Sequence, residues 1–377
     1  MQTREQFLKL LLAGSFVSGH LARAEQPCGK PAKTHSNQLD EPKIDAWTHI
    51  LPKAYLDRLQ ALPSGPLTPL IAFLSGIPAL YDLDARFRVM DMFGDYRQVL
   101  TPVPTIHVGV SIANPQLATD LVRLTNDAIA AMVNRSGGRF VGFAGMLPIW
   151  DPEVAILEVD RLIGLGAAGV QVEASVNGLP LDYARYEPFF ARMAELGRPI
   201  WIHPARTAAW TDYPAERTSR FGLWQALGWP YETSICLTRL VLAGHLERYP
   251  GLRIIAHHGG GMIPHFSGRL GANLDYLGQR LEPELGSALR SLSKHPIEYF
   301  RMMYVDTALF GAPHAMECLV DFFGADHVLF GTDTPFDPEQ GPGFIRDTVS
   351  DIDGLQLCEP ARKQIYAENV TGLLRRI

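Results

Sequence analysis

Short apolar stretches alternate with amphipathic stretches along the chain from Lys43 onward. The apolar stretches have the length of buried parallel strands, and the amphipathic ones repeat with the period of a helix. Such alternation is typical of βαβ units and therefore of a parallel sheet. Eight strands are predicted, at residues 43–49, 97–101, 140–147, 169–173, 199–203, 252–258, 302–307 and 328–333.

Helices and two irregular segments are predicted between these strands. The Pro- and Gly-rich residues 62–85 are expected to form a loop or lid, and residues 205–232 a long insert with several Trp and Tyr. The helices are expected at 53–60, 85–93, 118–134, 154–165, 186–196, 236–249, within 265–294, at 312–323 and at 359–374.

Eight successive βα units predict an α/β fold, a (β/α)8 TIM barrel with loop insertions that forms a single domain over residues 43–377. A doubly wound sheet is the alternative fold. The first strand is not followed by a GxGxxG turn, which counts against the dinucleotide-binding form of that alternative.

The composition narrows the classes of partner. The net charge is −6 and no Lys/Arg run forms a basic stripe, so neither nucleic acid nor a membrane surface is expected as a partner. The apolar runs fall short of the roughly 18 residues that a membrane-spanning helix needs. The four cysteines are widely spaced without a CxxC pair, which indicates neither a zinc ribbon nor a disulfide framework.

Residues 1–24 have the pattern of an export signal. An apolar block at 10–19 follows Arg4 and Lys9, and Ala22-Arg-Ala24 is a small-x-small cleavage pattern. The segment 3–9 is similar to a twin-arginine signal, with Glu5 in place of the second arginine. We expect a periplasmic protein, with residues 25–42 as a linker. If the leader no longer works, or is only an amphipathic helix, the protein is cytoplasmic.

Polar side chains end four of the predicted strands: His49, His203, His258 and Asp333. In a closed barrel these ends meet at one mouth, where imidazoles and a carboxylate can bind one divalent cation. Each residue alone could be structural, and Asp333 could cap the turn 332–335. His257 is expected to point to the opposite face of its strand as a structural residue.

Six segments of the chain resemble the amidohydrolase superfamily, within it the decarboxylase branch typified by amino-carboxymuconate-semialdehyde decarboxylase. They run in the family's order, and the HGGG and GTDxPF elements are the most specific. The segment 367–373 also resembles the family's closing helix. The six segments are 44–52, 86–91, 202–204, 258–269, 304–308 and 331–336.

The resemblance implies a metal site and an acid–base pair. It makes His49, His203 and Asp333 ligands of a divalent metal, with zinc expected first and manganese as the alternative. It makes His258, together with Asp333, the catalytic group. The first histidine of the family's HxH pair is replaced by Trp47, which cannot ligate a metal. A degenerate, metal-free site is therefore the competing interpretation.

The resemblance also implies how a carboxylic acid substrate is held. Arg269 matches an arginine that reaches into the neighbouring subunit of a homodimer, and Arg86 or Arg88 matches a second carboxylate-binding arginine. His265 and Trp47 are further candidates for substrate contact. The aromatic side chains of the 205–232 insert favour an aromatic or conjugated acid; they are Trp210, Tyr213, Trp224 and Trp229.

The function expected from these residues is metal-dependent, non-oxidative decarboxylation of an aromatic or conjugated carboxylic acid. Two alternatives stay open, because fold does not fix function. One is a metal-dependent hydrolase or hydratase that opens a lactone or adds water on the same barrel. The other is a pseudo-enzyme that binds a small acid without metal. Product analysis separates the decarboxylase from the hydrolase or hydratase. Metal content tests the metal-free pseudo-enzyme.

Overall fold

The computed structural model describes residues 41–104, 106–277 and 283–375. The export signal predicted at 1–24 and nearly all of the linker predicted at 25–42 lie outside these residues and stay predictions. No helix in the described part of the chain is long and apolar enough to cross a membrane.

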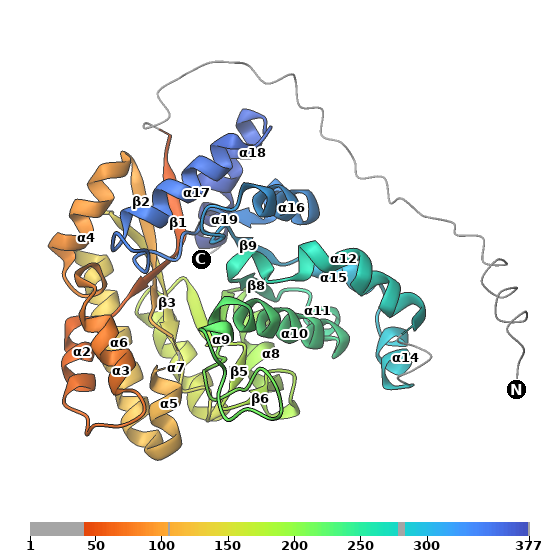
Figure 1. Ribbon diagram of the computed structural model, residues 1–377, viewed down its shortest axis with the longest axis horizontal. Coiled ribbons are helices and arrows are strands. Elements are labelled where there is room, and N and C mark those ends of the chain that lie inside the picture. The colour runs from red at the N-terminus through yellow and green to blue at the C-terminus, as the bar shows by residue number, and fades with distance from the viewer. Residues whose placement is uncertain (1–40, 105, 278–282, 376–377) are drawn as a thin grey trace, which may run out of the picture. The chain divides into compact units, whose positions relative to one another are not determined.

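Eight parallel strands form one sheet whose order follows the chain (Figure 1). Their existence confirms the strand count expected from the hydrophobic pattern. The register places Glu173 beside His203 and His49 beside Thr101, so the carboxyl ends of neighbouring strands lie at one level. The strands are β1 (Lys43–Ile50), β2 (Tyr96–Pro102), β3 (Phe140–Met146), β4 (Gly169–Glu173), β7 (Pro199–His203), β8 (Arg253–Ala256), β9 (Tyr304–Asp306) and β10 (Val328–Leu329).

The segment that follows β10 closes the sheet against β1. The Ala46 amide donates to the Phe330 carbonyl at 2.7 Å, and the Asp333 amide donates to the Trp47 carbonyl at 3.1 Å. A parallel bridge pairs Thr48 with Thr334. The predicted TIM barrel is therefore confirmed, and β1 and the β10 end share one side of its mouth.

Helices surround the strands, with the short hairpin β5 (Ser175–Val176) and β6 (Leu179–Pro180) beyond β4. They include α2 (Lys53–Gln60), α3 (Thr68–Ser75), α4 (Leu83–Met90), α5 (Ile106–Ala113), α6 (Pro115–Arg135), α7 (Pro152–Gly164), α8 (Glu187–Leu196), α9 (Leu223–Ala226), α10 (Gly228–Leu242), α11 (His245–Arg248), α12 (Ile263–Ala272), α14 (Pro283–Arg290), α15 (Pro296–Phe300), α16 (Pro313–Phe323), α17 (Pro342–Gly354), α18 (Glu359–Lys363) and α19 (Asn369–Arg375).

Several helical segments differ from the expectation. Residues 62–85 were expected to be a loop, but they contain α3 and the start of α4. Helix α10 begins at Gly228, inside the segment expected to be an irregular insert. Helix α9 also lies inside that segment, and helices α5, α15 and α17 were not predicted at all. These helices are short or Gly- and Pro-containing, so their sequences lack the long amphipathic period on which the prediction rested.

The barrel interior is filled by large side chains. Trp47 and Trp201 are fully buried, and the Trp201 indole donates across the barrel to the Ala46 carbonyl at 3.0 Å. Gly169 leaves room for this indole, because a Cβ there would lie 2.8 Å from the Trp201 ring and 2.1 Å from a backbone oxygen. The floor below the mouth is thus a packed apolar layer.

The cysteines in the described part of the chain are of two kinds. Cys236 and Cys318 are free thiols. Cys358, which precedes α18, is disulfide-bonded. The wide spacing of the cysteines did not indicate this bond, because spacing along the chain says little about proximity in the fold.

Candidate active site

A cluster of buried polar side chains lies at the carboxyl ends of the barrel strands. It draws on β1, β7, β8, β9 and the segment after β10, which are far apart in the sequence. None of its members is more than 8% exposed. The cluster consists of His49, His203, His257, His258, Asp306 and Asp333.

Asp333 lies at the centre of this cluster. One carboxylate oxygen, Oδ1, lies 3.0 Å from Nε2 of His49 and 3.4 Å from Nε2 of His257. The other oxygen, Oδ2, lies 3.6 Å from Nε2 of His258. The His203 ring centre lies 5.5 Å from that of His49 and 5.1 Å from that of His257. The four residues expected to meet at the barrel mouth therefore do so, with the histidines gathered around Asp333.

The imidazoles are oriented through their Nδ1 atoms. Nδ1 of His49 lies 3.2 Å from the Pro102 carbonyl, and Nδ1 of His203 lies 2.6 Å from the Pro204 carbonyl. Nδ1 of His257 bonds the Asp306 carboxylate. Carbonyl oxygens only accept hydrogen bonds, so Nδ1 of His49 and of His203 carries the proton. In the neutral ring Nε2 then carries the free lone pair, as in histidines that ligate metals.

The buried acceptor atoms at the centre fit a cation. Among the described residues, His49 Nε2, His257 Nε2 and Asp333 Oδ1 are buried without a hydrogen-bond partner. Two acceptors 3.0 Å apart repel each other unless a cation or a proton lies between them. Two overlapping triads could each hold a metal: His49 with His203 and His257, and His257 with His258 and Asp333. Imidazole and carboxylate donors suit Zn²⁺ and Mn²⁺.

The electrostatics of the cluster set the protonation of its members. Burial, with the neighbouring histidines, lowers the pKa of His203 well below its usual value, and burial with His257 lowers the pKa of His258. Burial opposes ionisation of Asp333, but His257, His258 and His49 outweigh it and hold the pKa of that carboxyl well below its usual value. At neutral pH His203 and His258 are therefore neutral and Asp333 is ionised.

His257 is the residue that the sequence interpretation missed. We expected it to point away from the site, and this is wrong. Strand β8 ends at Ala256, and His258 has a positive φ of 52°. His257 is extended, with φ −74° and ψ 158°, and continues the inward face of Ile255, which packs with Trp47. The positive φ turns His258 inward as well, so the two consecutive rings lie 3.7 Å apart on the same side. The doubled histidine was the available signal, but it did not show which of the two continues the inward face of the strand, nor the turn that brings in the other.

The glycines after His258 permit this turn. Gly259, Gly260 and Gly261 all have positive φ. A Cβ at Gly261 would lie 2.4 Å from the Pro230 carbonyl, so this position accepts only glycine without a backbone shift. The glycine run thereby fixes the direction of the two histidines and lets α10 approach the mouth.

Aromatic rings line the mouth beside the histidines. The Trp229 ring centre lies 5.2 Å from that of His203 and 6.0 Å from that of His258. Phe310 lies 5.8 Å from His258. On the other side Phe336 lies 5.3 Å from His49. The open side of the cluster therefore faces flat apolar surfaces.

The insert at 205–232 supplies part of this wall. Of its four aromatic candidates, Trp229 reaches the histidines and Trp224 packs against Trp229 at 5.5 Å. Trp210 lies over the Arg206 guanidinium, and Tyr213 is 69% exposed. The insert is held by the buried Glu232 carboxylate. It accepts from Ser175 Oγ at 2.7 Å and from the Ala205 amide at 2.8 Å.

Trp47 and Arg86 lie behind the cluster. The Trp47 ring is fully buried and stacks on His257, with ring centres 3.9 Å apart and an interplanar angle of 5°. Arg86 is buried in α4, where it donates to Gln98 Oε1 and to the His49 carbonyl, both at 2.7 Å. Burial lowers the pKa of Arg86 to about 10. Trp47 thus packs against the ring of His257, and Arg86 binds the backbone of His49.

The other predicted substrate-binding residues lie on exposed faces. Arg88 is exposed in α4. His265 and Arg269 are exposed one turn apart in α12. In the described part of the chain, no hydrogen bond, ion pair or ring contact joins these three residues to the histidine cluster.

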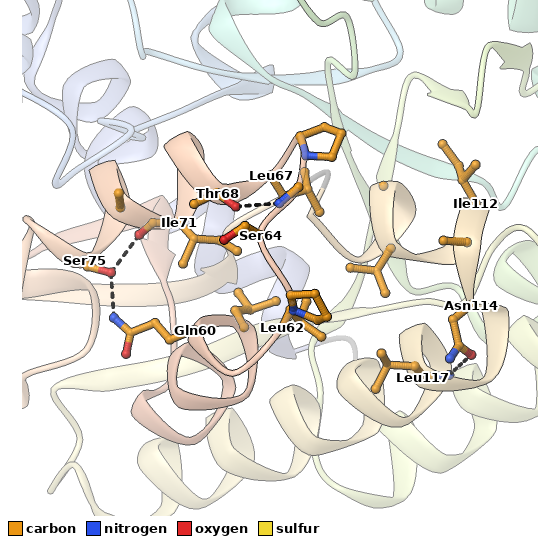
Figure 2. Close-up of a pocket in the computed structure, with 18 residues that line it drawn as sticks. Gln60, Leu62, Ser64, Leu67, Thr68, Ile71, Ser75, Ile112, Asn114 and Leu117 are labelled. Atoms are coloured by element: carbon orange, nitrogen blue, oxygen red, sulfur yellow. Dashed lines mark hydrogen bonds between the residues drawn. The ribbon is translucent and has the colours of Figure 1, made fainter.

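A separate apolar pocket of about 720 Å³ lies between the 62–68 segment, α3 and α5 (Figure 2). Leu67, Ile71 and Ile112 line it, together with polar groups such as Gln60 and Asn114. None of the described side chains that line it is titratable. It therefore offers no group for acid–base or metal chemistry.

Comparison with known proteins agrees with this geometry. The sequence profile described as Amidohydrolase matches residues 44–376. A 2-amino-3-carboxymuconate-6-semialdehyde decarboxylase from Dictyostelium discoideum is 30% identical over 82% of this chain and 86% of its own. A 6-methylsalicylic acid decarboxylase from Penicillium expansum is 27% identical over 89% of this chain and 97% of its own.

A solved structure shares the fold. The dihydroxybenzoic acid decarboxylase from Polaromonas sp. JS666, with bound manganese and the inhibitor 2-nitroresorcinol, has a TM-score of 0.69 and 24% identity. The alignment covers 89% of this chain and 97% of that one.

Proposed function

The chain belongs to the amidohydrolase family, and from that premise we propose that it is a metal-dependent, non-oxidative decarboxylase of an aromatic carboxylic acid. One observation carries the proposal. The Nε2 atoms of buried imidazoles converge on the ionised Asp333 beside a wall of aromatic rings. The curated relatives described above are decarboxylases of conjugated or aromatic acids, which supports the same reaction class.

His49, His203 and Asp333 are proposed to hold the divalent cation. Zinc is our first expectation from the donor atoms. Manganese is the alternative, and it is bound in the related dihydroxybenzoic acid decarboxylase. When bound, such an ion polarises a substrate oxygen and stabilises negative charge that develops on it.

His258 is proposed as the group that moves the proton. The neutral imidazole takes a proton from solvent and passes it to the substrate carbon that bears the carboxylate. Its lowered pKa makes the protonated ring a stronger acid, which favours this second transfer. The bond between that carbon and the carboxylate then breaks. Its electron pair restores the aromatic ring, and carbon dioxide leaves. Asp333, 3.6 Å from His258, stabilises the imidazolium form between these steps.

The aromatic wall is proposed to select the substrate. Trp229 and Phe310 beside His258 and Phe336 beside His49 offer faces against which a flat ring can pack. A planar acid held there has its carboxylate directed toward the histidine cluster. This favours an aromatic acid over a flexible aliphatic one.

The proposal is tested by product analysis with purified protein reconstituted with Zn²⁺ or Mn²⁺. Hydroxylated benzoic acids are supplied, and carbon dioxide release is measured beside the aromatic product. We expect one carbon dioxide per molecule of acid consumed, and its abolition by a chelator. Ring opening or water addition without carbon dioxide would instead establish the hydrolase or hydratase alternative.

A homodimer is proposed as the working assembly. Arg269 and His265 are exposed in α12, where they are available to a neighbouring chain. A guanidinium fork suits a substrate carboxylate.

Export to the periplasm is also proposed. The cleavage pattern Ala22-Arg-Ala24 and the disulfide at Cys358 support it, since disulfides persist in oxidising compartments. Cell fractionation with sequencing of the mature N-terminus tests it. A periplasmic chain that begins at Glu25 is expected, and a full-length cytoplasmic chain would contradict it.

A further inference from the structure

Trp47 and His257 form a stacked pair directly below the proposed metal site. The rings are parallel within 5° and 3.9 Å apart, and both are fully buried. An indole has no lone pair in its ring plane to offer a cation, whereas an imidazole has one. Of the two stacked rings, only His257 can therefore donate to a metal.

We propose that His257 Nε2 is the fourth protein ligand of the metal site, in addition to His49, His203 and Asp333. This inference rests on the proposed function, since it concerns the metal of the same site. It departs from the expectation that the Trp47 substitution leaves the site with three ligands. In this chain the donor comes from the strand β8 end instead of from β1.

The distances favour this assignment. His257 is the residue that the two candidate metal triads of the described chain share. Its Nε2 lies 3.4 Å from Asp333 Oδ1, and that oxygen lies 3.0 Å from His49 Nε2. Two donors of one tetrahedral zinc, each roughly 2.0–2.1 Å from the ion, are separated by about 3.3 Å. The observed separations are those of donors that share an ion.

Asp306 holds His257 in the tautomer that a ligand needs. Its Oδ2 bonds Nδ1 of His257, and its Oδ1 accepts from the Gly259 and Ala308 amides at 3.1 and 3.2 Å. A carboxylate on Nδ1 leaves Nε2 to face the cation, which is the usual support of a metal-bound histidine. Asp306 and Trp47 are thus positioning residues for the His257 ring.

A purely electrostatic role is the competing explanation. Protonated His257 would form an ion pair with both Asp306 and Asp333, and the stacked Trp47 would cover it. That arrangement needs no metal at Nε2. The two explanations differ in the number of imidazoles that a bound metal contacts: three with His257 and two without it.

The experiment counts those imidazoles. Full-length protein is stripped with a chelator and reloaded with Mn²⁺, and pulsed electron paramagnetic resonance measures the coordinated ¹⁴N nuclei. Mn²⁺ and Zn²⁺ affinities are measured by competition with a chelating dye. The variants are His257→Ala, His258→Ala as the matched control on the adjacent imidazole, and the double variant Trp47→His/His257→Ala.

We expect three coordinated imidazoles in the wild type and in His258→Ala. His257→Ala should show two and lose about 100-fold or more in affinity. The double variant should recover most of this affinity, because residue 47 lies directly below residue 257 and can return an imidazole to the site. If His257→Ala does not fold, the count in the wild type still decides.

Two coordinated imidazoles in the wild type, or unchanged affinity in His257→Ala, would overturn the ligand assignment. A wild type that binds neither metal would overturn it as well. By contrast, a chain that binds Mn²⁺ through three imidazoles but releases no carbon dioxide from any aromatic acid would leave the assignment standing. That result would refute the proposed function alone.

Discussion

The His258 imidazole is the group whose loss should separate chemistry from metal binding. In His258→Ala we expect decarboxylation to fall by about 10²- to 10⁴-fold, the usual contribution of a positioned acid–base group. Metal content should stay at the wild-type level, because His258 is not among the proposed ligands. Turnover and elemental analysis of the same preparations check both statements. Equal losses of metal and turnover would mean that His258 acts through the metal site.

Trp229 should contribute to substrate binding more than to the chemical step. In Trp229→Leu we expect KM to rise about 10-fold, since an aromatic contact is worth about 0.5–1.5 kcal/mol beyond its buried area. Trp229→Phe is the matched control. It keeps a ring but loses the 2.8 Å hydrogen bond from Nε1 to the Arg206 carbonyl, and its KM should change less. A loss in kcat with unchanged KM would instead place Trp229 in catalysis.

The predictability of the site from sequence differs from residue to residue. His49, His203 and Asp333 could be predicted to meet because each follows an apolar strand, and barrel strand ends share one face. His257 was misplaced because His258 was expected on the inward face of the strand. His257 continues that face from Ile255, and His258 reaches it only through its positive φ. The burial of Arg86 was equally hidden, since its partners Gln98 and the His49 carbonyl come from other elements.

Closure of the barrel between its first and last strands depends on the buried Asp45. Its carboxylate accepts from the Tyr96 and Thr332 hydroxyls, both at 2.6 Å, and from the Trp47 and Thr332 amides, both at 3.1 Å. It thereby joins β1, β2 and the segment after β10. Because Trp47 and Asp333 lie next to this junction, we expect the geometry of the proposed metal site to depend on it.

We expect Asp45→Ala to lower the free energy of unfolding by about 3–5 kcal/mol, because it leaves several buried donors without an acceptor. Asp45→Asn should cost less, since the amide keeps an oxygen acceptor and the hydroxyls can reorient toward its nitrogen. Denaturant unfolding of both variants provides the measurement. Equal stability of Asp45→Ala and the wild type would show that the segment after β10 closes the barrel through its backbone alone.

At the level of elements, strands were easier to predict than helices. Each barrel strand is an apolar run bounded by turn residues, so all eight were found. The helix α3 was expected to be loop because Gly and Pro surround it. It forms because Ile71 and Leu74 are buried beside α2. Tertiary packing of this kind overrides local composition, and a single sequence does not display it.

At the scale of the whole molecule, the proposed homodimer needs a surface through which two chains can associate. Leu227, Tyr231 and Ile235 are exposed and spaced four residues apart, so they lie on one side of α10. The Met262 amide before α12 donates to Ser234 Oγ in α10 at 2.7 Å, which joins this side to the helix that carries Arg269. Phe266 of α12 is also exposed, at 40%. We therefore expect the homodimer to form through α10 and α12.

The double variant Tyr231→Glu/Ile235→Glu should be monomeric, because two buried charges at an apolar contact cost several kcal/mol. Light scattering after size exclusion measures the mass, and decarboxylase assays follow on the same fractions. If Arg269 serves the neighbouring chain, the monomer should lose activity while keeping its metal. Phe73→Glu, an exposed position on α3, is the control and should stay dimeric. A fully active monomer would show that each barrel is self-sufficient and that Arg269 has no role across the interface.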